Sequence, residues 1–245
     1  MNGRPVRPVD AAGLILLRGS REVPEILLGR RHSKTPFLPD IYVVPGGRLD
    51  AADLLPSGFA EAVHPSVARD LAIGGRRPPI AFLRAALRET LEETGLMVGR
   101  PTTSAAGGAG ASPRQTPGAA PWAAYTQAGW EPDFAGLDFV LRAITPRESP
   151  RRYNTRFFLG DGSRVAGSLA GDGELLDLAW RPVGALDRLN IVDVTWELIR
   201  AALRRWRDRV AIGGERPKLL IYRNNNLVLT TLRAAPAKAG KPRRA

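Results

Sequence analysis

The stretch from residue 84 to residue 96, RAALRETLEETGL, constrains this chain more than any other. Its apolar spacing predicts one amphipathic helix, on which Glu89, Glu92 and Glu93 stand at i, i+3 and i+4 and share a face. Three carboxylates this close repel one another unless a cation lies among them, and such hard oxygen ligands suit Mg²⁺ or Mn²⁺. An ordinary solvated acidic face is the alternative interpretation.

A glycine turn precedes this helix in the chain. Residues 43 to 50, VVPGGRLD, read as a short buried strand that runs into a tight Pro-Gly-Gly turn. Pro79 near the first turn of the helix and Gly95 just after its last turn are typical start and stop signals. The sequence therefore predicts a strand, a glycine loop and an acidic helix in that order.

This combination resembles the box of the Nudix hydrolase family. That box is a Gly, five residues, a Glu, seven residues and then Arg-Glu-apolar-x-Glu-Glu-x-Gly-apolar. Gly47 would begin the box here, and residues 88 to 96 would close it, with Thr90 at the first apolar position. Asp53 stands where the family has the first Glu, and 34 residues separate it from Arg88 where the box has seven. An insertion therefore splits the box.

One branch of the family tolerates such a split. Members similar to the peroxisomal coenzyme A diphosphatase carry a PGGxLDAAD-like turn before a long insert, and residues 46 to 53, GGRLDAAD, match that turn. Residues 151 to 159 and 174 to 182 resemble later strands of the same fold, so the resemblance covers roughly residues 8 to 205. It implies an α/β fold: a Nudix-type α/β/α sandwich with a mixed β-sheet and a long insertion within the box.

The chain is expected to form a single domain over residues 1–233. The insertion at about 54–78 is predicted to be a surface excursion that forms one wall of the substrate pocket, with a short helix near 63–73. Residues 101–121 are predicted to be a flexible loop, and 234–245 a basic disordered tail. Further predicted elements are strands at 11–17, 25–30, 139–145, 155–160 and 176–181, helices at 122–127 and 195–209, and a hairpin at 218–231.

Composition limits the chemistry and the partners. The chain has no cysteine and two histidines, which excludes disulfides and thiolate zinc sites, so a metal must be bound by oxygen. The net charge of +12 favours polyanionic partners; nucleic acid is a less favoured one than a small phosphate compound, and a homodimer is compatible with the sequence. No apolar run approaches the roughly 20 residues that span a bilayer, and no signal-peptide layout is present, so a cytoplasmic protein without membrane contact is expected.

The resemblance assigns roles to the box. It implies that Glu89, Glu92 and Glu93 bind Mg²⁺ or Mn²⁺ and take part in catalysis, with the Gly46 carbonyl completing the metal's ligands. Arg88 would orient a box carboxylate and so belong to the catalytic set, although an ordinary i,i+4 salt bridge with Glu92 is the alternative.

The sequence offers several candidates for the substrate-binding residues and for the general base. Predicted substrate-binding residues are Arg30, Arg31, Arg156 and Gly47, and Arg151 and Arg152 are further candidates for gripping phosphates. The proton acceptor is a box Glu or one of Glu174, Asp172 and Asp177. Trp122, Trp130 and Trp180 are interpreted as core residues, with stacking on adenine as the alternative, and His32 and His64 as structural residues.

The predicted function is metal-dependent hydrolysis of a pyrophosphate bond in a nucleoside diphosphate linked to another moiety, with coenzyme A or acyl-CoA as the substrate suggested by the branch. ADP-ribose, NADH, dinucleotide polyphosphates and capped RNA remain alternatives. Another alternative is a catalytically silent ligand-binding module with the same fold, which the intact acidic cluster argues against. A basic RNA-binding protein would need aromatic and basic motifs that the sequence lacks.

Overall fold

The computed structural model describes residues 6–35, 38–102, 120–224 and 226–234. Within them, the main sheet contains nine strands in the order β10-β2-β1-β8-β7-β11-β12, with β3 paired to β2 and β4 paired to β1. The strands are β1 (Val9–Gly19), β2 (Pro24–Arg31), β3 (Tyr42–Val43), β4 (Gly46–Arg48), β7 (Asp138–Ile144), β8 (Tyr153–Asp161), β10 (Leu175–Pro182), β11 (Lys218–Arg223) and β12 (Asn226–Thr231). The sheet is mixed, because β1 pairs parallel to β8 and antiparallel to β2.

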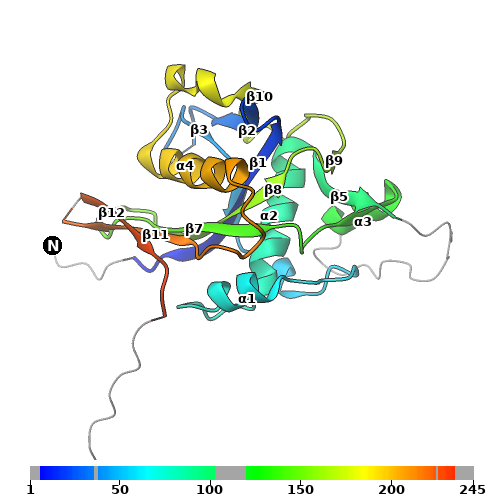
Figure 1. Cartoon of the computed structure of the whole chain (residues 1–245), viewed down its shortest axis with the longest axis horizontal. Coiled ribbons are helices and arrows are strands. Elements are labelled where there is room, and N and C mark those ends of the chain that lie inside the picture. The colour runs from blue at the N-terminus through cyan, green and yellow to red at the C-terminus, as the bar shows by residue number, and fades with distance from the viewer. Residues whose placement is uncertain (1–5, 36–37, 103–119, 225, 235–245) are drawn as a thin grey trace, which may run out of the picture.

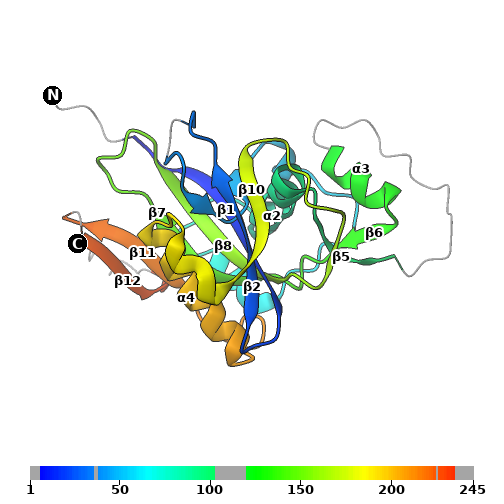
Figure 2. The ribbon, with the colours of Figure 1, turned by 90° about the horizontal axis from the view of Figure 1, so that it is seen from above.

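The central strand β1 explains why helices cover both faces of this sheet. Residues 11 to 17, AAGLILL, are buried throughout, so this strand has no solvent-facing side. Leu14 and Leu16 contribute to the core beneath α2 (Pro79–Thr94), while Ile15 and Leu17 contribute to the core beneath α4 (Asp193–Arg207). Figure 1 and Figure 2 show these two helices on opposite sides of the sheet. The predicted α/β/α sandwich is confirmed.

A second, three-stranded sheet lies beside the end of α2. It is built from β5 (Met97–Pro101), β6 (Trp130–Pro132) and β9 (Val165–Ala166), and α3 (Ala120–Gln127) packs against β6. The sequence did not predict these strands, which are two to five residues long. The helix at 122–127 was predicted correctly.

The insertion contributes to the core instead of lying wholly on the surface. It follows the short 3₁₀ turn η1 (Ala52–Leu54) and contains α1 (Pro65–Leu71), whose Val67 and Leu71 are buried in the core beneath α2. The side chain of Arg142 on β7 holds the end of the insertion, because it donates hydrogen bonds to the carbonyls of residues 73 and 74 at 2.7 and 3.2 Å.

The other strands and helices predicted from the sequence are present in the described part of the structure. The hairpin at 218–231 forms as β11 and β12, and the 3₁₀ turn η2 (Val183–Arg188) leads into α4. The predicted loop at 101–121 and the tail at 234–245 lie almost entirely outside the described residues. Over the described ranges, no helix has the combined length and apolarity needed to cross a bilayer.

Candidate functional site

The glycine loop and the acidic helix meet in the structure, although the insertion separates them in the sequence. Strand β4 carries the loop and pairs antiparallel with β1, which places Gly46 opposite Gly13. The backbone N–H of Gly46 donates a hydrogen bond of 2.8 Å to Oε2 of Glu93 on α2. This contact confirms the split-box prediction that Gly46 lies beside Glu93.

Close approach explains both glycines of the turn. A Cβ on Gly46 would lie 2.5 Å from the carbonyl oxygen of Ala12 and from Cα of Gly13, so the β1 backbone excludes a side chain there. A Cβ on Gly47 would lie 2.4 Å from the carboxylate of Glu89. The first glycine therefore allows the loop to pack on the sheet, and the second leaves room for an acidic side chain of α2.

The three glutamates of α2 differ in their surroundings. Glu93 is 5% exposed and forms no ion pair within the described residues. Burial, reinforced by the charges of Glu89 and Glu174, raises the pKa of Glu93 well above its ordinary value, although the Gly46 N–H and the charge of Arg31 oppose this shift. Burial also raises the pKa of Glu89, to about 7. The Glu92 side chain is 42% exposed.

Arg88 holds the first acidic residue of the split box. Its Nε and one terminal nitrogen donate to the two carboxylate oxygens of Asp53 at 3.0 and 2.9 Å, in a two-pronged pair. Asp53 is 1% exposed and so belongs to the interior. The match of Asp53 to the box, inferred from spacing alone, therefore corresponds to a direct contact with the helix.

The same guanidinium also contacts two of the clustered glutamates. Nη1 of Arg88 lies 2.9 Å from Glu89 and 2.8 Å from Glu92. Although burial acts against its charge, the surrounding carboxylates raise the pKa of Arg88 above its ordinary value. Arg88 therefore makes more than an isolated i,i+4 salt bridge, in keeping with the predicted orienting role.

The acidic cluster fits a divalent cation by its chemistry. In the conformation described, no three acidic or histidine side chains of the described residues converge closely enough to hold one ion. Arg88 accounts for this spacing, because it draws Glu89 and Glu92 toward itself while Glu93 bonds to Gly46. Among the described residues Glu93 nevertheless remains a buried carboxylate without an ion pair, which is the environment that a bound Mg²⁺ or Mn²⁺ compensates.

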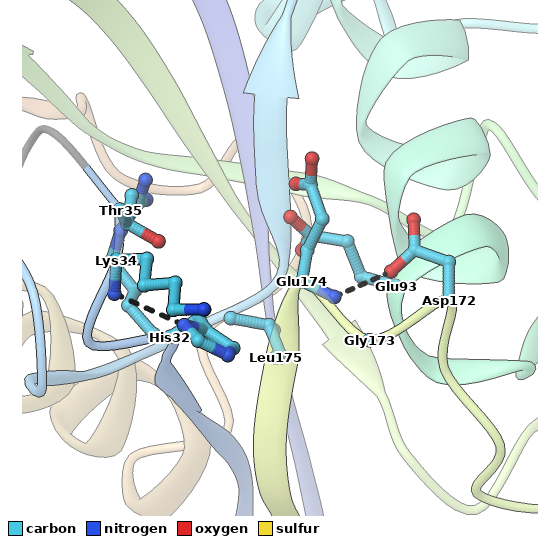
Figure 3. A pocket seen from close by; sticks show the side chains of 9 residues that line it. His32, Lys34, Thr35, Glu93, Asp172, Gly173, Glu174 and Leu175 are labelled. Carbon is cyan, nitrogen blue, oxygen red and sulfur yellow. Dashed lines mark hydrogen bonds between the residues drawn. The ribbon is translucent and has the colours of Figure 1, made fainter.

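A hollow of about 400 Å³ opens next to Glu93. Its residues come from the end of β2 and the segment after it, from α2, and from the loop before β10 with the first residue of that strand; they are Arg31, His32, Lys34, Thr35, Glu93, Asp172, Gly173, Glu174 and Leu175. Figure 3 shows His32, Lys34 and Thr35 on one side, facing Glu93, Glu174 and Asp172 on the other. The hollow therefore has a basic edge and an acidic edge.

The predicted phosphate-binding arginines lie in different environments. Arg31 lines the hollow, and its Nε is buried with no hydrogen-bond partner in the described part of the chain. Arg30 lies outside the lining and donates to Asp40 at 2.6 Å. Arg152 donates to backbone carbonyls of residues 6 and 145, so it has a structural role, and Arg151 is exposed.

The prediction for Arg156 was wrong. Its side chain is 1% exposed, pairs with Asp10 at 2.6 Å, and lies 4.0 Å from the ring centre of Phe82 on α2. The guanidinium is therefore enclosed between the sheet and the helix layer, where a substrate cannot reach it. Burial lowers the pKa of Arg156, although Asp10 opposes this shift.

The candidate proton acceptors lie at different places. Asp172 and Glu174 line the hollow, and Asp172 accepts a hydrogen bond of 2.9 Å from the Glu174 N–H. Asp177 lies outside the lining and accepts a hydrogen bond of 2.5 Å from Tyr42, which helps to hold the pKa of Asp177 below its ordinary value. The loop that precedes β10 thus supplies two carboxylates near Glu93.

Sequence reasoning missed part of the basic edge. His32 was predicted to be structural, yet it lines the hollow, and its Nδ1 accepts a hydrogen bond of 3.0 Å from the Lys34 N–H. Lys34 and Thr35 were not singled out at all. Their position soon after the predicted strand at 25–30, in the segment that leads to the glycine loop, was the available signal.

The tryptophans behave as core or packing residues. Trp122 is 7% exposed and packs against Tyr125 and Phe134, with ring centres 5.8 and 5.9 Å away. The guanidinium carbon of Arg18 lies over the Trp180 ring, 4.2 Å from the centre of that ring. Neither these two nor Trp130 belongs to the lining of the hollow.

Solved structures of Nudix hydrolases resemble the fold of this chain. No family model and no curated protein sequence matches the chain. A Nudix hydrolase from Alicyclobacillus acidocaldarius superposes with a TM-score of 0.59 at 25% identity, over 84% of this chain and 96% of that one. The MutT protein of Bacillus halodurans gives 0.46 at 13% identity, over 90% and 97% of the two chains. The Nudix domain of Shewanella oneidensis NrtR, solved with ADP ribose, gives 0.43 at 13% identity, over 83% and 94%.

The first of these likenesses supports the predicted family. The chain has the Nudix fold, and the enzyme class predicted from the sequence, a Nudix hydrolase, is that of the Alicyclobacillus protein. The coenzyme A branch stays a prediction.

Proposed function

We propose that this chain hydrolyses the pyrophosphate bond of a nucleoside diphosphate linked to another moiety, and that Mg²⁺ or Mn²⁺ is required. The observation that carries the proposal is Glu93, a buried carboxylate that forms no ion pair in the described structure and lies at the acidic edge of a hollow. An isolated buried carboxylate is costly unless a cation or a proton compensates it. Its place beside the glycine loop supports a cation.

The protein groups that would bind the cation are Glu89, Glu92 and Glu93, with the Gly46 carbonyl as a further ligand. Glu92 is exposed enough to turn from Arg88 toward an ion, since its side chain is 42% accessible. When bound, such an ion neutralises phosphate charge, orients the diphosphate and makes a water molecule acidic enough to attack phosphorus. Arg88 would keep the remaining carboxylates in place through Asp53.

The basic edge of the hollow would bind the phosphates. Arg31 has a buried Nε without a partner in the described residues, so a phosphate oxygen could accept its hydrogen bond without displacing a protein contact. Lys34 adds a second cation on the same side (Figure 3). With a divalent cation bound at the acidic edge, a diphosphate between the two edges would have its charge neutralised from both sides, which favours an anhydride over a neutral substrate.

Glu174 and Asp172 are the candidates for accepting the proton of the attacking water. Both line the hollow next to Glu93, and Glu174 is close enough to raise the pKa of Glu93. The hydrogen bond between the Glu174 N–H and Asp172 fixes the loop that carries them. Removal of one carboxylate at a time should show which of them controls turnover.

Coenzyme A or an acyl-CoA is the substrate that we propose within this class, on the match of residues 46 to 53 to the branch turn. ADP-ribose, NADH, dinucleotide polyphosphates and capped RNA compete with it. The hollow of about 400 Å³ is large enough for the diphosphate and adjoining groups, so it does not decide among them.

A catalytically silent binding module is the second candidate. Such a module needs a ligand site but not a buried acidic cluster. Carboxylates held close together repel one another and destabilise the fold when no bound cation offsets their charge. The three glutamates and their contact with Arg88 therefore favour an enzyme.

A substrate panel tests the proposal. Purified protein is incubated with each compound and Mn²⁺, and the products are separated by anion-exchange chromatography. We expect a nucleoside monophosphate and the matching phosphorylated moiety, loss of product in chelator, and loss of at least about a hundredfold in turnover for Glu93→Gln. The matched control is Glu197→Gln on the opposite helix layer, which should keep full activity. No cleavage of any diphosphate by folded protein would refute the proposal and leave the binding module.

A further inference from the structure

The insertion carries a carboxylate that reaches the acidic helix. Glu61 accepts hydrogen bonds from two nitrogens of Arg84 on α2, one of them Nε at 2.7 Å. Arg84 is 4% exposed, so this ion pair is largely enclosed. The N–H of Ser57 donates to the same carboxylate at 2.8 Å, which fixes its direction. The pair therefore ties the insertion to one defined point of α2.

Arg84 also contacts the residue that precedes the insertion. Its third nitrogen donates a hydrogen bond of 3.0 Å to the backbone carbonyl of Asp53. Glu61 thus holds a guanidinium that in turn fixes the Asp53 backbone. The Asp50 N–H donates to the Asp53 carboxylate at 2.8 Å and restrains the side chain as well.

The contacts continue from Asp53 to the candidate metal ligands. Asp53 forms the two-pronged pair with Arg88, one helical turn after Arg84. Arg88 in turn contacts Glu89 and Glu92 at 2.9 and 2.8 Å. A continuous series of hydrogen bonds therefore runs from the insertion through Asp53 to two of the clustered carboxylates.

The length of the insertion explains why the contacts from Glu61 to Arg88 are needed. In an unsplit box the chain itself keeps the acidic residue near its arginine, whereas 34 residues intervene here. No residue between 54 and 78 lines the hollow, so the insertion does not form the wall predicted for it. The carboxylate of Glu61 in the insertion pairs instead with Arg84 of α2, which in turn donates to the Asp53 carbonyl.

We infer that Glu61 and Arg84 are positioning residues, which fix Asp53 so that it holds Arg88 through two nitrogens. Glu89 and Glu92, which contact Arg88 through Nη1 alone, then stay able to turn toward the metal. This inference rests on the proposed function, because it assigns Glu61 and Arg84 a role at the same site. Their effect passes through Asp53, and they touch neither substrate nor metal. The insertion is thus a clamp that restores the geometry of the interrupted box.

The test compares Glu61→Gln with Asp53→Asn and with the double variant. Outer contacts of metal ligands typically change metal affinity by about 10–100-fold, so Asp53→Asn should weaken Mn²⁺ binding within that range, and Glu61→Gln, one contact farther away, by about 3–10-fold. In the Asp53→Asn background, Glu61→Gln should weaken binding by less than about twofold further, because its route is already broken. The KM for the nucleotide should stay within about twofold, since the basic edge of the hollow is unchanged.

A control separates positioning from general stability. Asp138→Asn breaks another buried ion pair, with Arg205, on the α4 side of the sheet. It should lower the melting temperature but leave Mn²⁺ affinity unchanged, with all variants measured where circular dichroism shows them folded. Unchanged affinity in Glu61→Gln, or full additivity with Asp53→Asn, would overturn the inference while wild-type hydrolysis stands. Wild-type protein that neither binds Mn²⁺ nor cleaves a diphosphate would instead overturn the proposed function, and the clamp with it.

Discussion

Replacement of Gly47 by alanine should disable the site without disrupting the fold. The added Cβ would lie 2.4 Å from the Glu89 carboxylate, whereas ordinary contact begins at 3.4 Å, so the carboxylate must move by about 1 Å. The obstacle is the far end of a flexible side chain, and the backbone need not shift. Because a displacement of about 1 Å can cost about a hundredfold in rate, Gly47→Ala should lower kcat by that order.

Gly46→Ala is the matched control. Its Cβ would lie 2.5 Å from backbone atoms of β1, which cannot rotate away, so this variant should lose stability by about 1–3 kcal/mol through overpacking. Thermal unfolding and turnover of the two variants are measured in parallel with Mn²⁺ saturating. A melting temperature for Gly47→Ala near that of the wild type, together with the loss in kcat, fits the reasoning. Full activity in Gly47→Ala would refute the assignment of Glu89 to the site.

Three further predictions follow from the charges of the structure. Mn²⁺ at a hundred times its Kd should stabilise the wild type by about 2.7 kcal/mol, or about 5–11 °C, and a Glu93→Gln variant that keeps this shift in a thermal melt would contradict its assignment. Although burial acts to raise the pKa of Glu61, hydrogen bonds from Arg84 hold this pKa below its ordinary value. The stabilisation of the fold by this ion pair is therefore present above about pH 4.5 and is lost as pH falls through the folded-state pKa of Glu61. Glu61→Gln should flatten the acid side of a stability-against-pH curve, and an unaltered curve would refute this. Arg156→Met should remove the ion-pair partner of Asp10, which Asn154 still hydrogen-bonds, and lower stability by about 1–3 kcal/mol in denaturant unfolding, yet change KM less than about twofold; a large rise in KM would restore Arg156 to the substrate site.

Local signals made the acidic helix and its loop predictable. Pro79 begins α2, and Gly95 ends it with a φ of 73°, a left-handed conformation that glycine adopts without strain. The unbroken apolar run of β1 similarly predicts a strand covered on both faces. These features depend on a few neighbouring residues, so the sequence alone specifies them.

Long-range contacts account for what the sequence did not reveal. Arg156 looks like any surface arginine until Asp10, 146 positions away, and Phe82 enclose it. His32 joins the hollow because β2 pairs with β10, which brings the loop before β10 opposite it. The strands of the small sheet are too short to carry a periodic pattern.

Calorimetric titration of Mn²⁺ into metal-free protein tests the central claim most directly. The wild type and Glu197→Gln, which changes a half-buried residue of α4 on the other face of the sheet, should bind with the same affinity. Glu93→Gln should bind at least about tenfold more weakly, since it removes the buried carboxylate that forms no ion pair within the described residues. Equal Mn²⁺ affinity in all three proteins, or no binding to the wild type, would contradict a metal-dependent hydrolase at this site.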